Sequence, residues 1–111
     1  MLNSVANASS LNLTTIGRRT GRPHTVTLWF VTHEDKIYVC SDGLRRRDWC
    51  RNILACPEVR VVVGGVEMDG TARPVDNPAQ RDEIKRLRYE RYRGGFMGMA
   101  KLFIEISPQD A

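Results

Sequence analysis

The sequence predicts a mainly β domain, a small barrel of about six antiparallel strands with two helices outside it. Short runs of alternating apolar and polar residues recur along the 111 residues, and this period is typical of half-buried strands. Two segments, residues 44–57 and 77–92, change to helical spacing. The expected order is therefore β-β-β-α-β-β-α-β. So many strands in one short chain favour closure, because closure removes exposed edges.

The first two strands form a hairpin around a basic loop. The runs Leu11–Ile16 and Thr25–Thr32 both alternate. Their connection, Gly17–Pro23, contains three arginines and two glycines. Glycine lets the backbone approach a ligand closely, and arginine binds phosphate or carboxylate through a planar fork. We interpret the loop as an anion site. A solvated hairpin explains the loop equally well when the loop is considered alone.

A third strand and the first helix follow. The turn His33–Asp35 leads into the strand Lys36–Cys40, and Ser41–Gly43 indicates a loop. Asp48 is placed to cap a helix that Pro57 ends. The face of this helix that is expected to be buried carries Trp49, Cys50, Ile53, Leu54 and Cys56.

A second basic cluster, Arg45–Arg47, lies just before this helix. Anions, and not cations, stabilise the positive end of a helix dipole. An anionic ligand at the helix start would explain three arginines in that place. The alternative is that the three side chains extend into water, at a cost of a few tenths of a kcal/mol, roughly, for each.

The second half of the chain repeats the pattern of strands and a helix. The strands Val59–Val63 and Val66–Pro74 are joined by two glycines, which is a strong hairpin signal. Asn77 then caps a helix that runs to about Tyr92 and has only a narrow apolar stripe. The final strand is Leu102–Ser107, with alternate residues facing the core.

Composition excludes several classes of protein. Hydrophobic residues make up 41% of the chain, so it is not a disordered chain, and no apolar run is long enough to span a membrane. The chain length of 111 residues suffices for one domain with one core, so a single domain over residues 1–111 is expected. The first ten residues lack the basic and apolar regions of a signal peptide, so the expected location is the cytoplasm. The net charge of +4 indicates an acidic partner.

Cysteine and histidine usage excludes a disulfide framework and a zinc site. Cys40, Cys50 and Cys56 are odd in number and form no C-x-x-C motif, so we expect free thiols in a reducing compartment. His24 and His33 have no clustered partners, so no metal site is expected.

The ordered motifs resemble a known family. L-x-L-T-T-I-G-R-R-T-G-R-P, then S-D-G, then D-W-x-R-N-x-x-A-x-P-E-V-R-V-x-V-G-G and finally F-I-E-I-S-P are similar to the flavin/deazaflavin oxidoreductases, most closely their deazaflavin-dependent nitroreductase branch. The resemblance covers about Leu11–Val75 and the last strand. It implies an FMN-binding-type split β-barrel and the coenzyme 8-hydroxy-5-deazaflavin, F420. This coenzyme carries a phosphate and an oligoglutamate tail, which agrees with two arginine clusters.

The resemblance also implies which residues bind the coenzyme. The first motif would line its phosphate and tail. Ser41 and the residues before and at the start of the first helix would border its phosphate and ring, and Asn52, one turn into that helix, would orient the segment before it. In the family, Lys-Ser often stands where this chain has Arg19-Thr20, and a basic residue often stands near His24. The residues assigned to the coenzyme are Thr14, Thr15, Arg18, Arg19, Thr20, Gly21, Arg22, Ser41, Arg45, Arg46, Arg47, Asp48 and Trp49.

The expected activity is transfer of a hydride from the reduced deazaflavin to a small quinone, nitro or enone acceptor. The coenzyme carries the hydride itself, so the protein needs no catalytic triad, paired carboxylates or metal. Tyr89, Tyr92 or a water molecule is a candidate proton donor. Trp49 is expected to pack in the core, with an edge-on contact to the coenzyme as the alternative.

Three other functions remain open at this point. The same fold holding FMN or haem is one, although FMN has no acidic tail to use so many arginines. A non-catalytic coenzyme carrier is the second. A nucleic-acid-binding barrel is the third, but it would need aromatic side chains among its cations, and here the arginines lie on loops while the aromatics lie on strands.

A homodimer is also expected. Trp29, Val31 and Phe103 fall on the strand faces opposite the core, and an interface over the strands Thr25–Thr32 and Leu102–Ser107 would cover them.

Overall fold

A computed structural model describes residues 8–41, 48–92 and 102–109. The mainly β architecture is the split β-barrel that was expected. Its elements, in chain order, are β1 (Leu11–Ile16), β2 (Pro23–Leu28), β3 (Phe30–His33), β4 (Lys36–Ser41), α1 (Asp48–Ala55), β5 (Glu58–Val63), β6 (Val66–Pro74), α2 (Pro78–Tyr92) and β7 (Leu102–Pro108).

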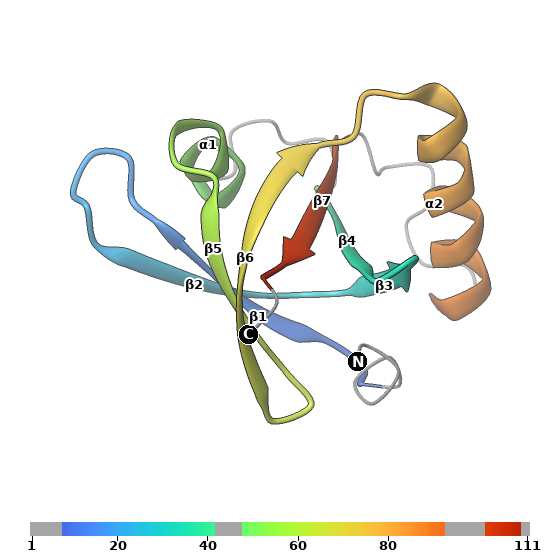
Figure 1. Ribbon diagram of the computed structural model, residues 1–111, viewed down its shortest axis with the longest axis horizontal. Helices are drawn as coiled ribbons and strands as arrows, with labels where there is room; N and C mark the ends of the chain where they lie inside the picture. Colours follow the sequence, from blue (N-terminus) through green and yellow to red (C-terminus); the bar gives the residue numbers. More distant parts are fainter. Residues whose placement is uncertain (1–7, 42–47, 93–101, 110–111) are drawn as a thin grey trace.

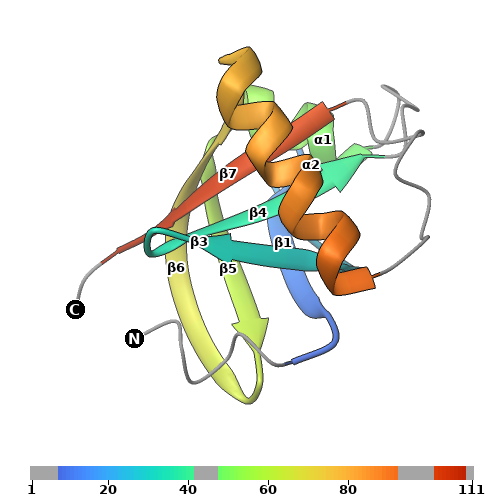
Figure 2. The same cartoon turned by 90° about the vertical axis from the view of Figure 1, so that its right-hand side faces the viewer.

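The strands form one curled antiparallel sheet with the order β2-β1-β5-β6-β7-β4-β3 (Figure 1). Helix α1 packs at one end of the barrel, beside the β1–β2 hairpin. Helix α2 lies across the outer face of β3, β4 and β7 (Figure 2). The two helices therefore cover different parts of the sheet, and only α1 lies beside the basic loop.

The single strand predicted over Thr25–Thr32 is two strands, which is why the sheet has seven strands and not six. The strand is interrupted at Trp29, since β2 ends at Leu28 and β3 begins at Phe30. Strand β2 pairs with β1 and β3 pairs with β4, at the two edges of the sheet. One extended stretch of chain thus links the two edges and curls the sheet into a barrel.

The phenol of Tyr92 occupies the point where this stretch bends. Its hydroxyl donates to the carbonyl of Phe30 at 2.9 Å and accepts from the amide of the same residue at 3.0 Å. Its ring stacks on Trp29 at 4.4 Å between centroids. A side chain from the end of α2 therefore satisfies backbone groups at the break between β2 and β3.

The barrel interior follows from the alternation of the strands. Residues that face inward on β1, β4, β5 and β7 pack against the buried residues of α1 in one core. Leu54, which was expected on the buried face of α1, is 64% exposed, and Cys56 lies just beyond the helix and is half-buried. The core consists of Leu11, Leu13, Phe30, Ile37, Val39, Trp49, Cys50, Ile53, Val59, Val61, Val63, Ala72, Ile104 and Ile106.

A second core lies between α2 and the outside of the sheet. Val31 and Phe103 pack there with Ile84, and all three are at most 4% exposed. The expectation that Val31 and Phe103 need a dimer interface is therefore wrong, because α2 of the same chain covers them. Trp29 is 41% exposed and is the one of the three residues that remains accessible to solvent.

The predicted turns and caps have clear physical causes. Gly64 and Gly65 have φ angles of 56° and 78°, which glycine adopts without strain, and they close the β5–β6 hairpin. The Oδ1 atom of Asn77 accepts from the amides of Ala79 at 2.9 Å and Gln80 at 3.2 Å, so Asn77 caps α2. In the described segments, no helix is long and apolar enough to cross a membrane.

Candidate functional site

The β1–β2 loop folds back on itself. The amide of Gly17 donates to the carbonyl of Arg22 at 2.7 Å, and the amide of Gly21 donates to the carbonyl of Gly17 at 2.8 Å. Gly21 has a φ of 70°, a conformation that residues with a side chain rarely adopt. The hydroxyl of Thr20 accepts from the amide of Arg22 at 3.2 Å. These bonds hold the backbone of the loop in a compact turn.

Asn52 fastens this loop to α1. Its Oδ1 atom accepts from both the backbone amide of Arg18, at 3.1 Å, and the guanidinium of Arg18, at 3.0 Å. Its Nδ2 atom donates to the hydroxyl of Thr15 at 3.1 Å. Asn52 and Thr15 are almost fully buried. The side-chain amide of Asn52 therefore orients the β1–β2 loop, whereas the resemblance implied that it orients the segment just before α1.

A cavity of about 160 Å³ opens between the loop and α1. The described residues that line it include no aspartate or glutamate. A Cβ atom on Gly17 would lie 2.8 Å from the hydroxyl of Thr20 and 3.0 Å from Nε2 of His24, so the missing side chain makes room for two polar groups. The lining residues are Gly17, Arg18, Arg19, Thr20, His24 and Asn52.

This donor set favours an anion. Arginine, histidine and threonine side chains and a glycine turn offer N–H and O–H donors, and two permanent positive charges stand beside them. No described lining residue offers a carboxylate to compete for them. The chemistry of the cavity thus fits a phosphate or a carboxylate.

The structure brings together only part of the predicted set. Arg18, Arg19 and Thr20 line the cavity, and Thr15 supports it through Asn52. Gly21 and Arg22 shape the loop but are not part of the lining. Thr14 faces the opposite side of β1, where its hydroxyl is 2.8 Å from that of Thr25 on β2.

The remaining predicted residues lie near the start of α1 or in the core. Trp49 is 6% exposed and packs in the barrel core, as expected. Ser41 ends β4, and Asp48 begins α1. Arg45, Arg46 and Arg47 lie outside the described residues, so the second arginine cluster stays a prediction.

His24 is the lining residue that the sequence reasoning left out of the site. It pairs across the hairpin with Thr15, so the two side chains share a face of the sheet. The signal was available in the alternation of β1 and β2, because a hairpin register that places Thr15 inward also directs His24 to that side.

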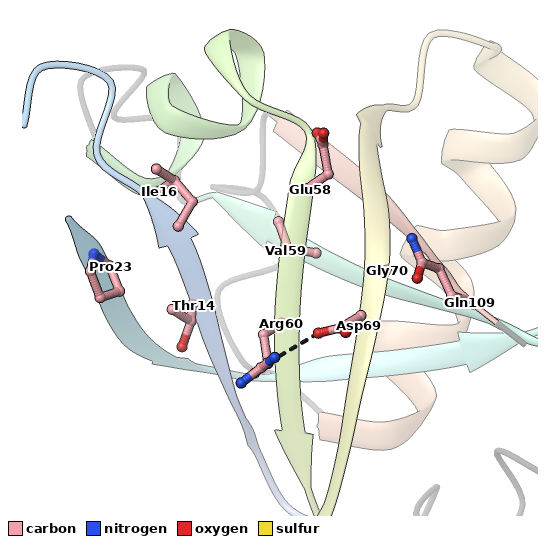
Figure 3. A pocket seen from close by; sticks show the side chains of 9 residues that line it. All are labelled: Thr14, Ile16, Pro23, Glu58, Val59, Arg60, Asp69, Gly70 and Gln109. Carbon is pink, nitrogen blue, oxygen red and sulfur yellow. Dashed lines mark hydrogen bonds and ion pairs between the residues drawn. The ribbon is translucent and has the colours of Figure 1, made fainter. Parts of the chain in front are cut away.

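A larger groove lies on the other side of β1 and extends over β5 and β6 (Figure 3). Its volume is about 370 Å³, and Thr14 and Ile16 line it together with residues of β5, β6 and the C-terminal segment. Arg60, the one arginine among the described residues that line it, is paired with Asp69 at 3.0 Å and with Glu67 at 3.2 Å. Glu58 and Asp69 also line this groove, and their carboxylates would repel an anion, so the groove fits an anion less well than the cavity beside α1, whose described lining includes no carboxylate.

A buried polar network lies on the far side of the sheet and was not predicted. Glu105 is 3% exposed and accepts from Arg73, Tyr38 and Gln80 at 2.8, 2.8 and 2.9 Å. Burial raises the pKa of the carboxyl, but these hydrogen bonds outweigh it, and the pKa of Glu105 is lowered. Burial and the same carboxylate raise the pKa of Tyr38 to about 12. The network anchors the first turn of α2 to the sheet.

Neither of the two tyrosines expected as proton donors lines the described cavity. The hydroxyl of Tyr92 is engaged by the backbone of Phe30 and by the carbonyl of Ser9 at 3.2 Å. Tyr89 is 57% exposed on the surface of α2. The structure thus gives Tyr92 a role in packing at the break between β2 and β3.

A comparison with sequence models of protein families matches residues 3–95 to the F420H(2)-dependent quinone reductases. A search of curated proteins finds no match.

Solved structures with the same fold are numerous. The F420-H2 dependent reductase FDR-A has a TM-score of 0.73 at 22% identity, covering 89% of this chain and 94% of its own. The haem-storage protein HutZ from Vibrio cholerae has a TM-score of 0.80 at 16% identity, covering 98% and 87%. A chain that forms a domain-swapped dimer has a TM-score of 0.72 at 23% identity, covering 91% and 80%. At these identities the likenesses show the fold.

Proposed function

This chain belongs to the family of F420H2-dependent quinone reductases, and we propose that its acceptor is a small quinone and that the cavity beside α1 binds the anionic part of F420. Membership makes the protein a reductase that depends on the deazaflavin coenzyme. The observation that carries the proposal is the cavity itself. Arginines and other hydrogen-bond donors line it, and its described lining residues include no aspartate or glutamate. The buried side-chain amide of Asn52 holds the loop that forms one wall of the cavity.

The residues present fit the coenzyme. Its phosphate and oligoglutamate tail are polyanionic, and Arg18, Arg19 and Thr20 offer the donors that such groups need. Reduced F420 supplies the hydride, so the protein must position the coenzyme and exclude water from it. Asn52 and Thr15 hold the loop rigid before the ligand arrives, which lowers the entropy lost on binding.

Quinones are the preferred acceptors because the family is defined by them, and nitro compounds and enones are the alternatives. The experiment is oxidation of F420H2 by the purified protein with a quinone, a nitroarene and an enone in turn. We expect the largest kcat/KM with the quinone. Turnover of a nitroarene alone would reject the quinone proposal, and no turnover with any of the three would favour a coenzyme carrier.

Haem binding is the second candidate, because the fold is shared with HutZ. In this case the arginines beside α1 would bind the haem propionates. Addition of haemin to the purified protein would give a sharp Soret band if a side chain ligates the iron. We expect no such band at equimolar haemin, and a band that F420 cannot displace would favour haem.

We further propose that the protein is a cytoplasmic homodimer. None of the three cysteines forms a disulfide, which suits a reducing compartment. A protein of the same fold forms a domain-swapped dimer. Light scattering on the eluting protein should give twice the mass of the chain, 12.6 kDa, and a monomer at micromolar concentration would reject the dimer.

A further inference from the structure

Arg88 of α2 carries a positive charge that no described carboxylate pairs with. Its side chain is half-buried, and its Nε atom is buried without a hydrogen-bond partner among the described residues. Arg88 takes part in none of the ion pairs that join described residues, whereas Arg86 on the same helix is paired with Glu83 at 2.7 Å and with Glu90 at 2.8 Å. A buried donor and a charge without partners both cost free energy, so an anion would stabilise Arg88.

Two neutral groups lie next to the guanidinium of Arg88. One is the thiol of Cys40 on β4, and the other is the indole of Trp29, whose centroid is 5.9 Å away. Burial raises the pKa of the Cys40 thiol by more than the charge of Arg88 lowers it. The thiol therefore stays protonated at neutral pH and supplies no negative charge to the guanidinium.

Trp29 presents an apolar surface beside this cation. It is 41% exposed and lies at the break between β2 and β3. Tyr92 stacks on it with 4.4 Å between ring centroids and 4° between ring planes, and the hydroxyl of Tyr92 is bonded to the backbone of Phe30. The indole is therefore held in place, so a ligand that contacts it does not have to order it on binding.

We propose that Trp29 and Arg88 form a binding site for an aromatic carboxylate. The carboxylate pairs with the guanidinium, whose planar fork suits such a group, and the ring of the ligand covers the exposed part of the indole. The site lies where α2 meets the break between β2 and β3, away from α1 (Figures 1 and 2). Neither residue lines the cavity beside α1, so the proposal does not depend on F420 binding there.

The test is an NMR titration of the full chain with 2-naphthoate and with the neutral 2-naphthamide. The chain has two tryptophans, the exposed Trp29 and the buried Trp49, and Trp29→Phe assigns their indole N–H signals. We expect 2-naphthoate to shift the signal of Trp29 and not that of Trp49, and to bind about tenfold more tightly than 2-naphthamide. Arg88→Gln should abolish this preference. Arg86→Gln is the matched control and should retain it, because the charge of Arg86 is already paired.

Three results would overturn the site: a Trp29 signal that 2-naphthoate does not shift, equal affinities for the two probes, or a preference that Arg88→Gln leaves unchanged. If Arg88→Gln does not fold, Arg88→Lys replaces it. This variant keeps the charge but not the planar fork, and should bind 2-naphthoate more weakly than the wild type does. Equal binding by Arg88→Lys and the wild type would also reject the site.

Two ligands share this chemistry, a carboxylated quinone that is reduced and an aromatic acid that is not. Oxidation of F420H2 by anthraquinone-2-carboxylate and by its carboxamide separates them. A lower KM for the acid, lost in Arg88→Gln, identifies the acceptor as the ligand, and equal KM values while 2-naphthoate still binds identify a separate acid. Absence of turnover with both quinones counts against the proposed function, and the naphthoate titration still decides the site.

Discussion

Asn52 shows how one buried side chain can organise a site. A neutral amide accepts from the backbone and the side chain of Arg18 and donates to Thr15, so one residue of α1 fixes the loop and the end of β1. The resemblance implied that Asn52, one turn into the helix, orients the segment before that helix, whereas its contacts with the β1–β2 loop are a finding of the structure.

Replacing Asn52 by alanine should lower the free energy of unfolding by about 1–3 kcal/mol, since it leaves the buried hydroxyl of Thr15 without its donor. F420 affinity should fall more than stability alone explains, because the loop loses its preorganised shape. Urea unfolding and fluorescence titration measure the two effects. Asn12→Ala is the control, since Asn12 bonds Thr27 on the exposed face of the same hairpin. Equal affinities in the two variants would contradict this role.

Glu105 should make stability depend on pH. Its folded-state pKa is lowered, so its contribution is complete above the pKa of the unfolded chain, about 4.3, and is lost as the pH falls through the lower folded value. The urea midpoint of Glu105→Gln should be below that of the wild type at neutral pH, and the gap should narrow below about pH 4. A gap that widens in acid would contradict the assignment.

The stretch from β2 to β3 was predicted as one strand but forms two. The alternation of apolar and polar residues does not change at Trp29, because Val26 and Leu28 before it and Phe30 after it are all even-numbered positions that face the core. The sequence pattern therefore does not mark the division. The break arises from the pairing of one stretch with two different strands, β1 and β4. Sequence pattern alone therefore predicted the residues of the strand but not its division.

Tyr92 should stabilise that division. Tyr92→Phe keeps the ring that stacks on Trp29 but removes the hydroxyl that bonds the amide and carbonyl of Phe30. We expect a loss of about 1–2 kcal/mol in unfolding free energy and faster hydrogen exchange at the Phe30 amide. The control is Tyr89→Phe, on an exposed position of α2, which should change neither. Similar exchange rates in both variants would show that the hydroxyl is dispensable.

Helix α2 explains a second difference between expectation and structure. The sequence showed its narrow apolar stripe, including Ile84, and it showed apolar residues on the outer faces of two strands. It did not show that these faces meet, because strand order places β4 between β3 and β7 and so assembles Val31 and Phe103 under one helix. The hydrogen-bond network around Glu105 could not be predicted from local sequence patterns either, because it joins residues 25 to 67 positions apart.

At the scale of the molecule, the site lies where the β1–β2 hairpin meets α1 at the end of the barrel (Figure 1). The barrel fold, the basic loop and its likeness to a deazaflavin family were all predicted from local patterns and ordered motifs. The cavity depends on a contact between Arg18 and Asn52, which lie 34 positions apart in the sequence, so it could be identified only from the structure. The net charge of +4 favours anionic ligands in general and gives no preference among them.

The measurement that tests the account most directly is the affinity of the full chain for F420 and for FMN over a range of salt concentrations. The polyanionic tail of F420 should give it the tighter binding, and salt should reduce the difference by screening the arginines. The combined replacement of Arg18, Arg19 and Arg22 by alanine should weaken F420 binding by roughly 1.5–3 kcal/mol for each bidentate arginine–anion pair that it removes, while removal of the exposed ion-paired Arg86 should not. Tighter binding of FMN at every salt concentration, or undiminished F420 binding by the loop variant, would contradict the central claim.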